Sequence, residues 1–106
     1  MKLVISRGDG KGKIFELEEG SNLLGRWDPD SGAFPEVDLE EHDVDAKVSR
    51  KHAVIIRVGE KLTLKDLESR NGTFVNRGER LKPEAEVELK VGDEIVVGKV
   101  FLTVAI

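Results

Sequence analysis

Apolar and polar residues alternate in short runs along most of this chain, and glycine-containing turns separate the runs. A period of two in segments rich in Val, Ile, Leu, Thr and Phe predicts short β-strands with one buried face. No window shows the apolar stripe that a helix of two turns would need. We expect about ten strands, at residues 2–6, 13–18, 22–26, 36–39, 52–58, 61–66, 73–76, 86–90, 94–97 and 99–105.

The alternation lapses between residues 27 and 46, which carry eight acidic residues and no Lys or Arg. Pro29, Gly32 and Pro35 interrupt this segment as well. We therefore expect a long surface loop, of about residues 27–47, in which 36–39 is a short edge strand. We call it the acidic loop and interpret it as an insertion in a single domain of residues 1–106.

The strand pattern predicts an all-β fold in which two antiparallel sheets pack face to face. Such a β-sandwich gathers its loops at two ends, where binding residues usually lie. Both ends of the chain are predicted strands, so it could be one domain of a larger protein.

The amino-acid composition excludes several classes of function. The 17 basic and 21 acidic residues give a net charge of −4, which argues against a general binder of nucleic acid or anionic membrane. Without cysteine there is no thiol nucleophile, disulfide or cysteine zinc site, and only two histidines are present. The apolar run of residues 3–5 is too short for a signal peptide, and no stretch could span a bilayer. These features favour a cytoplasmic binding module without metal or cofactor.

Polar and charged donors gather in three loops next to predicted strands. Arginine has a planar fork of N–H donors, and serine has a rotating hydroxyl. Together with backbone N–H groups they suit the acceptor oxygens of a phosphate dianion. If the sandwich brings the loops together, they form an anion site, made of Gly25-Arg26, Val48 to His52 and Ser69 to Thr73.

The order and spacing of these motifs resemble the pattern of the forkhead-associated (FHA) domain family. The family pattern is Gly-Arg, then Ser-x-x-His, then Asn-Gly-Thr with another Asn three residues on. In this chain the pattern covers Gly25-Arg26, Ser49 to His52, Asn71-Gly72-Thr73 and Asn76. The resemblance extends over nearly the whole chain and implies a β-sandwich of about eleven strands that binds phosphothreonine in extended peptides.

The resemblance also implies a role for each residue. Arg26 and Ser49 would contact the phosphate, Arg50 the phosphate or the peptide, and Asn71 the peptide main chain. The remaining residues would shape the site, namely Gly25, His52, Ser69, Gly72, Thr73 and Asn76. The implied partner is a Thr-phosphorylated protein, a substrate of a Ser/Thr kinase, and the module itself would not be an enzyme.

Some alternatives stay open at this stage. Arg70 stands where the family often has a small hydroxyl residue, so it could contact phosphate or point to peptide or solvent. The acidic loop could favour basic residues beside the phosphothreonine or could simply be solvated. Because salt screens charges beyond about 8 Å, we expect the direct donors to outweigh its acids. The competing function is a phosphate-independent interaction or dimerisation module of the same fold.

Overall fold

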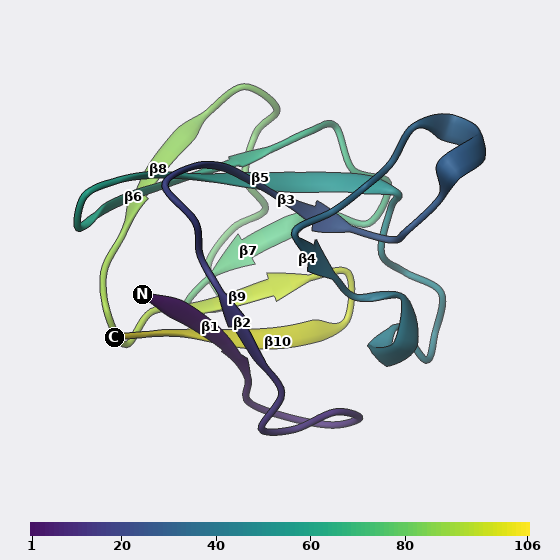
Figure 1. Cartoon of the computed structure of the whole chain (residues 1–106), viewed down its shortest axis with the longest axis horizontal. Helices are drawn as coiled ribbons and strands as arrows, with labels where there is room; N and C mark the ends of the chain where they lie inside the picture. Colours follow the sequence, from purple (N-terminus) through teal and green to yellow (C-terminus); the bar gives the residue numbers. More distant parts are fainter.

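The alternating pattern forms ten β-strands in the computed structural model, which describes residues 1–106 (Figure 1). Two short 3₁₀ helices, η1 (Pro29–Ser31) and η2 (Glu40–His42), are the only helical segments. No helix is long and apolar enough to cross a membrane. The strands are β1 (Lys2–Ile5), β2 (Ile14–Glu16), β3 (Gly20–Gly25), β4 (Val37–Asp38), β5 (Lys51–Val58), β6 (Lys61–Asp66), β7 (Thr73–Val75), β8 (Glu86–Leu89), β9 (Glu94–Val97) and β10 (Val100–Ala105).

The strands build two five-stranded sheets, ordered β2-β1-β10-β9-β7 and β4-β3-β5-β6-β8. The predicted all-β sandwich is therefore confirmed, with ten strands where the resemblance implies about eleven. All the strand pairs are antiparallel except β3 and β4, which run parallel. The two ends of the chain lie close together because β1 pairs with β10 (Figure 1).

The core lies between the two sheets. Leu3, Ile95 and Leu102 from one sheet are completely buried, as are Ile55 and Leu64 from the other. Burying a side chain of this size contributes about 1.5–3 kcal/mol relative to leaving it exposed. The core thus fixes the register of every long strand, since a slip by one residue would turn these side chains to solvent.

The topology brings the three candidate loops to one end of the sandwich. β3 ends at Gly25 beside Lys51, where its antiparallel neighbour β5 begins. β6 ends at Asp66 beside Ala53 of β5, and β7 begins at Thr73, shortly after β6. The segments that contain Arg26, Ser49 and Asn71 therefore leave the sheets on the same side.

The acidic loop is more ordered than the sequence suggests. The expected edge strand is present as β4, parallel to the end of β3. Asp28 and Ala33 form an isolated β-bridge around η1, with two backbone hydrogen bonds of 2.9 Å. Ala33, Val37 and Leu39 are completely buried. These apolar anchors hold the loop against the end of the sandwich that carries the candidate site.

Candidate functional site

A β-bulge turns His52 into the interior at the start of β5. The register between β3 and β5 shifts there, because Leu24 lies opposite Ala53 but Gly25 lies opposite Lys51. A bulge leaves one residue unpaired and breaks the alternation of faces. His52 and Ala53 are consequently both completely buried, although they are neighbours in a strand.

The buried imidazole of His52 joins two of the candidate loops. Its Nδ1 accepts a hydrogen bond of 2.9 Å from the backbone N–H of Ser49. Its Nε2 lies 2.8 Å from the carbonyl oxygen of Gly72 and therefore carries the proton. Burial lowers the pKa of His52, against the opposing effect of the Gly72 hydrogen bond and of nearby carboxylates. His52 is thus a neutral brace between the two loops.

A second buried hub, Asp66, shapes the loop of residues 67–72. Its carboxylate accepts hydrogen bonds from the Ser69 hydroxyl at 2.6 Å and the Thr73 hydroxyl at 2.7 Å. The Ser69 oxygen in turn accepts the backbone N–H of Gly72 at 3.0 Å. Burial raises the pKa of Asp66, but the hydrogen bonds from Ser69 and Thr73 outweigh it and lower the pKa overall. Asp66 is therefore an ionised anchor for this loop.

Gly25 lets the end of β3 approach the backbone just before β5, its neighbour in the same sheet. A Cβ atom built on Gly25 would lie 1.9 Å from the carbonyl oxygen of Arg50. The same carbonyl accepts the backbone N–H of Arg26 at 3.1 Å. Only glycine therefore allows the close approach of the two backbones that places Arg26 beside Arg50.

Replacing Gly25 with Ala should destabilise the protein by about 1–3 kcal/mol or more, because backbone must move to make room. Urea unfolding would measure this loss. Gly78→Ala is the matched control, since its Cβ would meet nothing closer than 3.3 Å and its φ lies outside the left-handed region. A Gly25 variant as stable as the Gly78 variant would contradict the argument from space.

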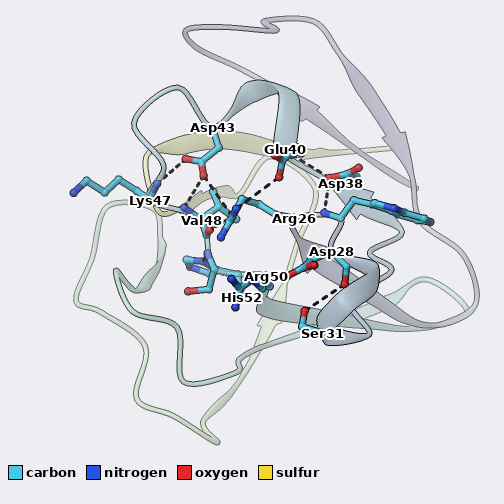
Figure 2. A network of polar contacts seen from close by, with 12 residues as sticks. Arg26, Asp28, Ser31, Asp38, Glu40, Asp43, Lys47, Val48, Arg50 and His52 are labelled. Carbon is cyan, nitrogen blue, oxygen red and sulfur yellow. Dashed lines mark hydrogen bonds and ion pairs between the residues drawn. The ribbon is translucent and has the colours of Figure 1, made fainter.

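Arg26 is held in place before any ligand arrives. Its Nε donates a hydrogen bond of 2.6 Å to the carbonyl oxygen of Val48. Asp43 lies 4.0 Å from the same nitrogen and accepts the backbone N–H groups of Lys47 and Val48 at 2.8 and 3.0 Å (Figure 2). One third of the Arg26 side chain remains exposed. The Nε side of the guanidinium is therefore fixed by the protein, whereas its outer side is open to solvent.

Ser49 directly follows Val48, whose carbonyl oxygen holds the Arg26 guanidinium. Its Oγ accepts the backbone N–H of Arg70 at 3.1 Å and has no other hydrogen bond in the structure. A hydroxyl that accepts one bond can still donate its own proton. The Arg70 contact therefore leaves the Ser49 proton free to point to a ligand.

Asn71 ties its loop to the segment before Ser49. Its Nδ2 donates a hydrogen bond of 3.0 Å to the carbonyl oxygen of Lys47, which leaves its Oδ1 available as an acceptor.

Gly72 has a φ of +90°, which a residue with a side chain rarely adopts. The guanidinium of Arg80 donates to the carbonyl oxygen of Ser69 at 2.6 Å. Arg80 is a second brace that sequence reasoning missed.

The structure thus brings together Arg26, Ser49, Arg50, Asn71 and the backbone of Arg70. The Arg70 side chain is exposed and makes no hydrogen bond or ion pair. Asn76 lies apart from the group, at the far end of β7, where it contacts Asp93 and Glu94 of the β9 region. None of the three surface hollows is lined by the grouped residues, so the candidate surface is open and could accept an extended chain.

Known proteins resemble this chain in sequence and in fold. The FHA domain family matches residues 23–98. The chain belongs to the FHA domain family. Glycogen accumulation regulator GarA of Mycolicibacterium smegmatis is 38% identical over 104 residues, which cover 95% of this chain and 58% of GarA. The chain therefore spans little more than half of this relative.

Two solved structures resemble this FHA domain closely. One comes from work on phosphothreonine-dependent FHA domain interactions, with a TM-score of 0.77 and 35% identity over 99% of this chain and 94% of that one. The other is the FhaA FHA domain complexed with the intracellular domain of Rv3910, with a TM-score of 0.75 and 34% identity. That alignment covers 96% of each chain, and FhaA is a Mycobacterium tuberculosis protein.

The lowered pKa of His52 predicts how the stability of this FHA domain depends on pH. The unfolded chain takes up a proton at His52 near the ordinary pKa of 6.5, whereas the folded protein resists protonation until a lower pH. The His52 contribution should be complete above 6.5 and decline as pH falls to the folded pKa.

Urea unfolding between pH 8 and 5 would reveal this decline in the free energy of unfolding. His52→Gln has no group that titrates in this range, so its curve should be flatter. The window is separate from that of Asp66, whose stabilisation declines only below its ordinary pKa of 3.8. Equal slopes for the two proteins between pH 6.5 and 5 would show that His52 does not resist protonation.

Proposed function

We propose that residues 1–106 form one FHA domain that binds phosphothreonine in an extended peptide. Arg26, Ser49 and Arg50 bind the phosphate, and Asn71 holds the peptide main chain. The observation that carries this proposal is the geometry of Arg26 beside Ser49. The Arg26 guanidinium is fixed by Val48 at 2.6 Å, and the hydroxyl of Ser49 has a free proton.

Phosphate selectivity follows from charge. A phosphate dianion offers three acceptor oxygens and about −1.5 to −2 charges at neutral pH, whereas threonine offers a neutral hydroxyl. Charge-assisted hydrogen bonds are roughly twice as strong as neutral ones. The unphosphorylated peptide would therefore leave the arginines without a partner and bind weakly.

The module acts as a non-catalytic reader in the cytoplasm, and its partners are substrates of a Ser/Thr kinase. The similar structures support this part of the proposal. One comes from work on phosphothreonine-dependent interactions, and the other holds an FHA domain with an intracellular partner domain. Asn71 adds a contact that does not depend on the phosphate, through the free Oδ1 opposite its bond to Lys47.

A peptide-library experiment tests the proposal. The immobilised protein is exposed to peptides with a central phosphothreonine and random flanks, and separately to the same library with threonine. Retention that requires the phosphate supports the reader. A folded protein that retains neither library contradicts it and favours the phosphate-independent interaction module.

A further inference from the structure

Both arginines assigned to the phosphate are already in contact with carboxylates of the acidic loop. The Nε of Arg50 lies 2.6 Å from Asp28 Oδ2. The Nη1 of Arg26 lies 3.7 Å from Glu40 Oε2 (Figure 2). The sequence suggested that these acids would act only at long range. The structure shows that expectation to be wrong for Asp28 and Glu40, because the loop folds back onto the site.

The carboxylate of Asp28 is positioned by the backbone of its own loop. Its Oδ1 accepts the backbone N–H of Asp30 at 3.2 Å and so caps η1. The backbone of Asp28 is fixed in turn by its bridge to Ala33. Only 24% of the Asp28 side chain is exposed. Oδ1 of Asp28 therefore caps η1, and Oδ2 points to Arg50.

We propose that Asp28 is an intramolecular competitor of the phosphothreonine phosphate for Arg50, and that Glu40 acts in the same way, more weakly, on Arg26. This inference rests on the proposed function. A phosphate that engages Arg50 has to displace the carboxylate or share the guanidinium with it. Asp28 and Glu40 thus lower the affinity for every anionic ligand.

The competition sets a threshold that favours doubly charged ligands. A peptide carboxylate that binds Arg50 exchanges one single negative charge for another, so it gains little. A phosphate dianion brings additional charge and more acceptor oxygens to both arginines. The acidic loop would therefore keep acidic unphosphorylated peptides unbound at concentrations at which phosphorylated ones bind.

Asp28→Asn is the direct test. Asparagine caps a helix as well as aspartate does, so η1 is retained, but its neutral amide cannot form the ion pair with the Arg50 guanidinium. The probe is the phosphothreonine peptide that the wild-type protein retains best from the library. We expect its affinity to rise about three- to fivefold, the upper part of the range for an exposed ion pair, because this pair is short.

Asp30→Asn is the matched control. It removes the same charge two residues away, yet the Asp30 carboxylate is exposed and forms no ion pair. Its affinity should stay within about 1.5-fold of wild type, since exposed charges at a distance are screened. Glu40→Gln and its neighbour Glu41→Gln form a second pair, in which we expect a gain of about twofold for Glu40 alone.

The outcomes separate this inference from the function on which it rests. Tighter binding by Asp28→Asn but not by Asp30→Asn, with a difference that shrinks at 0.5 M salt, supports the competitor. Binding by Asp28→Asn that is weaker than wild type, or equal to that of Asp30→Asn, overturns it while the reader stands. If the folded wild type and Asp28→Asn both fail to bind any phosphothreonine peptide, the proposed function fails, and this inference with it.

Discussion

Arg26→Ala should weaken phosphothreonine-peptide binding by about 2–5 kcal/mol while the fold is retained. The loss is large because the Arg26 side chain is two-thirds buried and its Nε is fixed by the carbonyl oxygen of Val48. A positioned charge of this kind needs little reordering when the anion arrives. At tenfold per 1.4 kcal/mol, isothermal titration should show an affinity about 30- to several-thousandfold lower.

Two further variants show whether peptide affinity depends on the charge of Arg26 or on the planar geometry of its guanidinium, and whether the effect is specific to Arg26. Arg26→Lys keeps the charge but loses the two-pronged geometry, so it should recover only part of the affinity. Arg77→Ala removes an arginine that pairs with Glu94 near Asn76, away from the site, and it should bind like wild type. Unchanged affinity in Arg26→Ala, or an equal loss in Arg77→Ala, would contradict a specific role for Arg26.

Stability gives an independent check on the same variant. Val48 loses one hydrogen bond in Arg26→Ala, but Asp43 still accepts two backbone N–H groups from the same segment. The expected loss in the free energy of unfolding is about 1–3 kcal/mol, because the carbonyl oxygen of the buried Val48 is left without its donor. Weak binding by a variant that is still folded would therefore reflect the lost contact and not a disordered site.

The fold could be predicted because each strand has its own local signal. Alternation in 52–58 and 61–66 places Ile55 and Leu64 in the core, as the structure shows. The three loops were found because Arg26, Ser49 and Asn71 all adjoin strands. The convergence of these loops follows from antiparallel pairing, so the sequence could predict a site at one end of the sandwich.

The remaining features depend on contacts between distant segments, which no local pattern records. The bulge buries both His52 and Ala53, whereas a period of two predicts only one of them inside. Arg80 reaches back 11 residues to Ser69. Asp28 meets Arg50 only because the bridge to Ala33 and the buried Leu39 fold the acidic loop back onto the site. In the sequence these acids were just part of a charged stretch.

His52→Ala should lower the free energy of unfolding by about 3–5 kcal/mol, which is a large share of the 5–15 kcal/mol of a typical domain. The imidazole is completely buried, so its removal leaves a cavity. It also leaves the N–H of Ser49 and the carbonyl oxygen of Gly72 without their partners. An unsatisfied buried polar group costs about 1–3 kcal/mol.

The effect of this change on binding should be indirect, because His52 holds Ser49 and not the ligand. Phosphopeptide affinity, measured where the variant is fully folded, should fall less than in Arg26→Ala. His52→Gln should recover part of the stability, since its side-chain amide could donate to Gly72 as Nε2 does. Loss of binding in His52→Ala without loss of stability would show that His52 contacts the ligand. The opposite result, low stability with residual affinity, is what a buried brace between two loops requires.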